Sequence, residues 1–121
     1  MNLNRLPGLL SLALIAPLLA GCSAPTSQSL AKDICESRFT LIDIDPNSEA
    51  GAPKWFEIYQ KAAEIRNSSS PTEQDLAVAT SMEDWFESAY TAVQEGAEWP
   101  IYGEAFAAAG MELNTACQSI E

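Results

Sequence analysis

Ser70 to Glu95, SPTEQDLAVATSMEDWFESAYTAVQE, is the stretch that most firmly predicts one element of secondary structure. Ser70 is placed to cap a helix, Pro71 suits the first helical position, and Glu73 completes a capping box. Gly96 follows at the point where such a helix would stop. Apolar side chains recur every three or four residues, which predicts one long amphipathic helix whose buried face consists of Val78, Met82, Trp85, Ala89, Ala92 and Val93.

Two segments before this stretch carry the same helical periodicity. Residues 30–38 are expected to form a first helix with Ser29 as its N-cap, and residues 53–66 are expected to form a second one. Between them, residues 39–42 are β-prone, and residues 43–51 are rich in the Pro, Asn, Ser and Gly that form loops.

A last helical stretch is expected from Trp99-Pro100 to about Ser119. Gly103 and Gly110 interrupt it, and each costs about 1 kcal/mol relative to alanine inside a helix. They indicate a late start, a kink or a place where helices pack closely. The sequence therefore predicts an all-α fold, a small bundle of three to four helices over residues 30–121.

The first 21 residues differ in composition from the rest of the chain. One basic side chain, Arg5, precedes an apolar run over residues 6–19 that only Ser11 interrupts. This order is typical of a secretory signal. The run is shorter than the about 20 apolar residues that a membrane-spanning helix needs.

Leu19-Ala20-Gly21-Cys22 ends this run and resembles the signal of bacterial lipoproteins, which carries Leu, two small residues and then Cys. The resemblance implies that diacylglycerol is attached to the Cys22 sulfur and that residues 1–21 are removed. Residues 22–29 would form a lipidated N-terminus and polar tether. Two acyl chains anchor stably, whereas one binds only marginally. The expected location is the cell membrane, with the domain of residues 30–121 lipid-anchored and facing away from the cytoplasm.

The charge balance excludes one class of partner. The chain of 121 residues holds 17 acidic and 6 basic side chains, a net charge of −11. Without Arg5, 17 acids stand against 5 bases, a net charge of −12. Nucleic-acid binding needs a basic surface, so no nucleic-acid partner is expected. Acidic surfaces also promote solubility, so a cationic partner is an alternative that the charge alone does not require.

Cysteine usage predicts one disulfide. The chain has three cysteines and no histidine, which removes the commonest general base and metal ligand. If Cys22 is lipidated, Cys35 and Cys117 remain as an even pair on the apolar faces of their predicted helices. In an exported protein such a pair predicts a disulfide, with two buried thiols as the alternative.

One acidic segment partly matches a calcium loop. Asp43, Asp45 and Asn47 occupy its first, third and fifth positions. Ser48 stands where the sharp turn requires Gly, and Lys54 stands where the bidentate Glu belongs. We interpret the segment as a polar loop, with weak cation binding as the alternative.

No set of residues specifies a reaction. Glu83 and Glu87 stand four apart on one helix face, where a solvated surface explains them better than acid–base chemistry does. The sequence has no Gly-rich phosphate loop and no Cys-x-x-Cys spacing. No enzymatic activity, cofactor or metal is expected.

A surplus of aromatic residues is expected to form the core. The alternative is that one or two of them are exposed and contact a protein or glycan. The residues are Trp55, Phe56, Tyr59, Trp85, Phe86, Tyr90, Trp99 and Tyr102.

The function expected from these features is a non-enzymatic interaction module that binds an envelope component or exported protein. The alternative is a lipoprotein that binds a small ligand or cation in an acidic or aromatic cleft. A flat aromatic patch would favour the first, and a cleft rimmed by Asp43, Asp45 or Glu49 the second. A deep pocket with two facing carboxylates would favour an enzyme.

Overall fold

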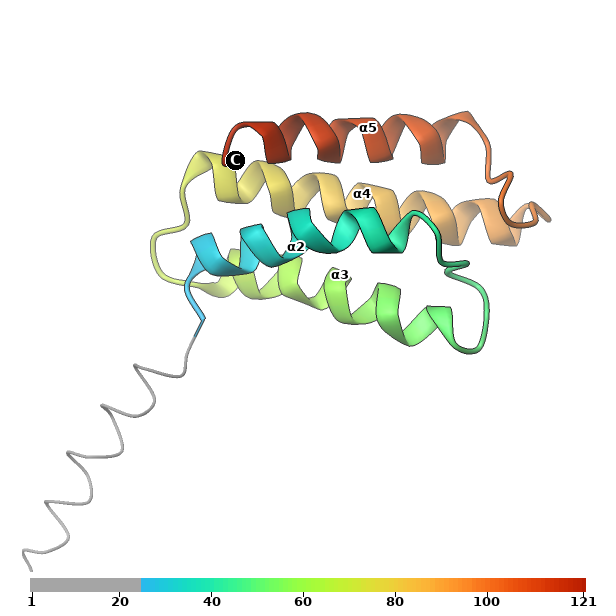
Figure 1. Ribbon diagram of the computed structural model, residues 1–121, viewed down its shortest axis with the longest axis horizontal. Helices are drawn as coiled ribbons and strands as arrows, with labels where there is room; N and C mark the ends of the chain where they lie inside the picture. The colour runs from blue at the N-terminus through green and yellow to red at the C-terminus, as the bar shows by residue number, and fades with distance from the viewer. Residues whose placement is uncertain (1–24) are drawn as a thin grey trace, which may run out of the picture.

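The computed structural model describes residues 25–121 and shows a four-helix all-α domain (Figure 1). Successive helices lie side by side and run in opposite directions (Figure 1). The predicted fold class is confirmed. The predicted leader and Cys22 lie outside the described residues. The four helices are α2 (Ser27–Leu41), α3 (Gly51–Asn67), α4 (Glu73–Gln94) and α5 (Glu104–Gln118).

Helices α2 and α4 lie diagonally opposite each other in the bundle and are in contact. Each packs against all three other helices, and α3 and α5 each pack against both of them. The α2–α3 loop and the α4–α5 connection, residues 95–103, lie at one end of the bundle, and α2 begins at the other (Figure 1). Within residues 25–121, no helix combines the length and apolarity that crossing a membrane requires.

Helix α4 begins two residues later than predicted, so Ser70 and Glu73 do not form its capping box. The box is made by Thr72 and Asp75: the Asp75 N–H donates to Thr72 Oγ1 at 3.0 Å, and the Thr72 N–H donates to the Asp75 carboxylate at 3.4 Å. Asp75 is buried, and its carboxylate also accepts a hydrogen bond of 2.8 Å from the Ser27 hydroxyl, which offsets the cost of that burial. This third contact ties the start of α4 to the start of α2, which Glu73 does not do.

Helix α2 extends beyond the predicted residues 30–38 at both ends. Its N-cap is Thr26 rather than Ser29, and Ser29 is instead the third helical residue of a capping box. At the other end, the β-prone residues 39–41 are helical. Burial of Leu41, which is only 2% exposed, explains the extension, because packing outweighs the weak β preference of this segment.

Helix α5 begins at Glu104, not at Trp99-Pro100. Glu98 and Ile101 face each other across a short turn, and Gly103 forms the N-cap with a φ of +99°. That left-handed conformation suits glycine, which has no Cβ to clash. Gly103 therefore marks a late start of the last helix, one of the outcomes that the sequence left open.

Trp85 lies at the centre of the core. Its ring centroid is 4.5 Å from that of Trp55 and 5.6 Å from that of Phe106. A Cβ added to Gly110 would lie 3.0 Å from Trp85 Nε1, so α4 and α5 approach closely at this glycine. The prediction that Trp85 is buried is confirmed. Of the outcomes left open for the glycines, Gly110 marks a place where two helices pack closely.

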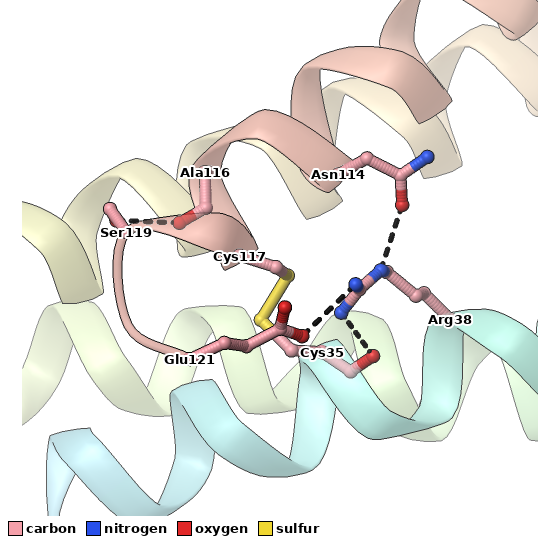
Figure 2. Close-up of polar contacts among 7 residues, drawn as sticks. All are labelled: Cys35, Arg38, Asn114, Ala116, Cys117, Ser119 and Glu121. Atoms are coloured by element: carbon pink, nitrogen blue, oxygen red, sulfur yellow. Dashed lines mark hydrogen bonds and ion pairs between the residues drawn. A yellow bond between two sulfur atoms is a disulfide. The ribbon is translucent and has the colours of Figure 1, made fainter.

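Cys35 and Cys117 form a disulfide between α2 and α5, as predicted (Figure 2). Their Cα atoms are 5.6 Å apart, and both residues are buried. The bridge closes a loop that contains α3 and α4 entirely. It therefore restrains the unfolded chain over most of the domain.

We expect the double substitution Cys35→Ala/Cys117→Ala to lower the free energy of unfolding by about 2–5 kcal/mol. The sequence separation is 82 residues, for which the chain-entropy relation gives about 4.5 kcal/mol. Alanine is used because both sites are buried and serine would add an unsatisfied hydroxyl. Denaturant melting measures the change, with reduced wild-type protein as the control. A loss below about 1 kcal/mol would show that the bridge contributes little.

Candidate functional site: an apolar groove between two helices

An open apolar groove lies between the last turn of α2, the first three turns of α5 and the α4–α5 connection. Its cavity volume is about 750 Å³, within the range of about 300–1,000 Å³ typical of ligand sites. We call this feature the apolar groove. Its residues are Arg38, Phe39, Ile42, Trp85, Pro100, Ile101, Tyr102, Gly103, Glu104, Phe106, Ala107, Gly110, Met111 and Asn114.

The rim of the apolar groove is unusually hydrophobic for a protein surface. Phe39 is 64% exposed, Ile42 56%, Ile101 78% and Met111 68%. These four are among the six large apolar side chains that are exposed within residues 25–121. Exposed apolar residues gathered around one concavity mark an interaction surface, whereas single ones scattered over a surface do not.

The floor of the apolar groove is formed where α4 and α5 meet. Trp85 from α4 and Phe106 from α5 line it, and a Cβ added to Gly110 would lie 3.0 Å from the indole nitrogen of Trp85. The two buried tryptophans differ in their indole N–H groups: that of Trp55 donates to the Ile44 carbonyl at 2.8 Å, whereas Trp85 Nε1 faces Gly110.

Arg38 lines the groove at the end where Asn114 lies. It is also close to the disulfide (Figure 2). Its Nε donates to Asn114 Oδ1 at 2.8 Å, its Nη1 donates to the Cys35 carbonyl at 2.6 Å, and its Nη2 lies 3.0 Å from a Glu121 carboxylate oxygen. Its guanidinium carbon also lies 4.2 Å from the centre of the Phe39 ring. These contacts fix the last turn of α2 against α5.

Sequence reasoning did not single out Arg38 or Asn114. A signal for Arg38 was present, because it lies four residues after Ile34 and so falls on the apolar face of its helix. A cation in that position requires polar partners from another segment. Asn114 and Glu121 supply them, but their pairing depends on the approach of α5 and carries no sequence signature.

Tyr102 and Asp45 join two loops at the other end of the groove. The Tyr102 hydroxyl donates to Asp45 Oδ1 at 2.9 Å, and the same oxygen accepts the Asn47 N–H at 2.8 Å. Burial, together with the hydrogen bond to Asp45, raises the pKa of Tyr102 to about 12. Trp99 and Phe106 pack edge-on against the ring of Tyr102.

Asp45 of the partial calcium loop makes structural contacts. Residues 43–50 form a loop, as predicted, and Asp45 is held by Tyr102 and Asn47. In the part of the chain that the structure describes, no three His, Cys, Asp or Glu side chains gather where they could hold a metal ion. Asp43, Asp45 and Glu49 do not line the apolar groove.

The acidic pair on α4 lies away from the groove. Glu83 binds Arg66 of α3 at 2.7 Å, and Glu87 is exposed. Among the described residues that line the apolar groove, Glu104 is the only acid, so two facing carboxylates do not meet there. The arrangement can bind an apolar surface.

The predicted aromatic residues divide between core and surface. Trp55, Trp85 and Tyr102 are buried, whereas Phe56 and Tyr90 are 47% and 62% exposed. The exposed pair lies on α3 and α4, away from the apolar groove. The sequence did not predict the groove because its residues come from four separate segments. Its rim residues Phe39, Ile42 and Met111 were not among the aromatic residues named above as binding candidates.

Comparison with known proteins adds no relationship: no family model, curated protein or solved structure matches the chain. The fold and the site together define a small four-helix domain with a disulfide and an open apolar groove.

Replacing Tyr102 with phenylalanine should change how stability depends on pH. The folded state raises the pKa of Tyr102 from 10 to about 12, so it binds the phenol proton more tightly than the unfolded state does. This stabilisation is complete below pH 10 and is lost as the pH rises toward 12. Tyr102→Phe should therefore lessen the decline in unfolding free energy over that interval, and cost about 1 kcal/mol near pH 7.

Denaturant melts between about pH 7 and 11 measure this effect. Tyr90→Phe is the matched control, because its ring is exposed. Equal pH slopes for the Tyr102→Phe variant and the wild type would show that the contact with Asp45 has no effect on titration.

Proposed function

We propose that the protein is a membrane-anchored bacterial envelope lipoprotein and that its helical domain is a non-enzymatic interaction module. The observation that carries this proposal is the apolar groove with its four exposed rim residues. Leaving such a surface in water is unfavourable, because each Å² of apolar area removed from water contributes about 25 cal/mol. A partner that covers the rim gains this energy.

The lipoprotein part of the proposal draws on the Leu19 to Cys22 sequence and on the disulfide. Disulfides persist in exported proteins and are rare in reducing compartments. An anchor on Cys22 also suits the position of the groove. Helix α2 begins at Ser27, close to that anchor in sequence, and reaches the groove with Arg38, Phe39 and Ile42. At 1.5 Å per residue, the groove stands roughly 20 Å further from the bilayer than the start of α2 if the helix points outward.

A small apolar ligand is the second candidate occupant, and the cavity volume favours it. The exposed rim favours a larger partner. Sites for small molecules usually bury about 70–90% of the ligand in an enclosed concavity. A small molecule seated on the floor formed by Trp85 and Phe106 would leave Ile101 and Met111 in water. We therefore place the protein partner first.

The lipid anchor is tested by Cys22→Ser. This change removes the sulfur to which diacylglycerol would be attached, so the protein should leave the membrane pellet or remain unprocessed. Fractionation of cells followed by mass measurement of the mature N-terminus reports both outcomes. Ser23→Ala, one residue further on, should leave the membrane fraction unchanged. A Cys22→Ser protein that is still mature and membrane-bound would exclude the lipid anchor.

The interaction surface is tested by site-specific photo-crosslinking in intact cells. A photoreactive residue at Ile101, on the rim of the groove, should give a discrete adduct with an exported or envelope protein. The same residue at Tyr90, which is exposed away from the groove, should not. Adding Met111→Asp should abolish the Ile101 adduct, because a carboxylate in the apolar rim is costly to desolvate. Equal adducts from Ile101 and Tyr90, or none from Ile101, would contradict the proposal.

A further inference from the structure

The shape of the apolar groove is that of a trough along α5. The residues of α5 that line it run from Glu104 to Asn114, following Gly103 at the N-cap. At 1.5 Å per residue this wall is roughly 15 Å long, about three helical turns. The facing wall is the last turn of α2 followed by Pro100 and Ile101. A rod-like occupant of about three turns matches the length of the trough.

The walls of the trough are apolar on both sides. Phe39 and Ile42 on one wall and Met111 on the other are more than half exposed. An occupant that contacts both walls covers all three, and Met111 can adjust to different side chains because it is unbranched and flexible. An amphipathic helix meets this requirement with residues spaced i, i+3 or i+4, and i+7.

The groove lies on an acidic domain. Glu104 lines it and is exposed, and the chain holds 17 acidic against 6 basic side chains. The one basic lining residue, Arg38, already has its guanidinium bound to Asn114, the Cys35 carbonyl and Glu121. The groove is therefore complementary to positive charge, which steers association and rejects acidic partners.

We propose that the apolar groove receives a basic amphipathic helix of a partner protein, with its apolar stripe on the floor formed by Trp85 and Phe106. Its Lys and Arg residues face Glu104 and the net negative charge of the domain. This inference rests on the proposed function and specifies the chemistry of the partner. Charge complementarity and the exposed rim favour this occupant over a fatty acid, an acidic peptide or a second copy of this acidic chain.

The test uses residues 22–121 exported behind a cleavable leader, with Cys22→Ser so that no lipid is attached. The probe is a labelled synthetic helix of about fourteen residues, Leu and Lys only, with Leu at the i, i+3 or i+4, i+7 spacing. Two peptides serve as controls: one with every Lys replaced by Glu, and one with the same Leu and Lys in scrambled order. Fluorescence anisotropy at low and at physiological salt gives the affinities.

We expect the Leu/Lys helix to bind at least tenfold more tightly than the Leu/Glu helix and the scrambled peptide. Because any basic peptide is attracted to an acidic protein, variants of the groove decide the result. Phe39→Ser/Met111→Ser should weaken binding at least tenfold, whereas the matched pair Phe56→Ser/Tyr90→Ser should change it less than about twofold. All four side chains are exposed, so the variants should remain folded, which melting curves check.

A charge variant distinguishes attraction by the acid at the groove from attraction by the overall charge of the protein. Glu104→Lys should weaken binding of the Leu/Lys helix and reduce its sensitivity to salt, whereas Glu64→Lys, exposed on α3, should have a smaller effect. If Glu104→Lys and Glu64→Lys lower the affinity for the Leu/Lys helix equally, overall charge alone attracts the peptide. The same conclusion follows if the two serine pairs lower the affinity equally. Either result overturns the proposal.

Other occupants give different results. Binding of dodecanoate that is lost in Phe39→Ser/Met111→Ser, without binding of the Leu/Lys helix, would identify a small apolar ligand. A concentration-dependent dimer that the same variant abolishes in sedimentation would identify a second copy. Both results overturn the helix proposal. If the Ile101 adduct forms in cells while the Leu/Lys helix fails to bind, only the chemistry assigned to the partner is wrong. If both fail, the interaction module is wrong as well.

Discussion

The contact between Trp85 and Gly110 determines the spacing on which the rest of the domain depends. Because Gly110 has no side chain, α5 approaches the indole of Trp85 closely, and a single added Cβ would lie 3.0 Å from Nε1. This approach brings Phe106 to within 5.6 Å of Trp85, measured between ring centres. Further along α5, Cys117 bonds to Cys35 and Asn114 to Arg38 of α2. Helix α5 is thus held to α4 by close packing and to α2 by a covalent link, and the floor of the apolar groove lies where α4 and α5 meet.

Much of the helical architecture was predictable, because apolar periodicity is a local property of the chain. Residues 53–66 were expected to form a helix by their apolar periodicity, and the residues that carry it, Trp55, Ile58, Ala62 and Ile65, are all buried. The disulfide was also predictable, because Cys35 and Cys117 leave one pairing once Cys22 is set aside as the expected lipid site. Helix ends were less predictable. The chain offers two overlapping capping boxes, and a contact with Ser27, 48 residues away, selects the one built on Asp75.

The apolar groove was not predictable from sequence for a physical reason. Its walls come from separate segments whose approach is set by Trp85, Gly110 and the disulfide. In the sequence, Phe39 and Ile42 look like part of a β-prone segment, and their exposure follows only from the extension of α2 to Leu41. Met111 gives no signal in a helix that is apolar over much of its length. Glu104 is one of 17 acidic residues, and its place beside the groove cannot be read from the total charge.

The disulfide also determines what a protease can release. Residues 35–117 form a covalent ring, and all three connections between helices, residues 42–50, 68–72 and 95–103, lie inside it. One cut in any of these connections opens the ring but leaves both fragments joined through Cys35 and Cys117. Everything on the N-terminal side of Cys35, including Cys22, stays attached to both fragments. A domain held at a cell surface by its N-terminus would therefore keep both pieces at that surface after a single nick.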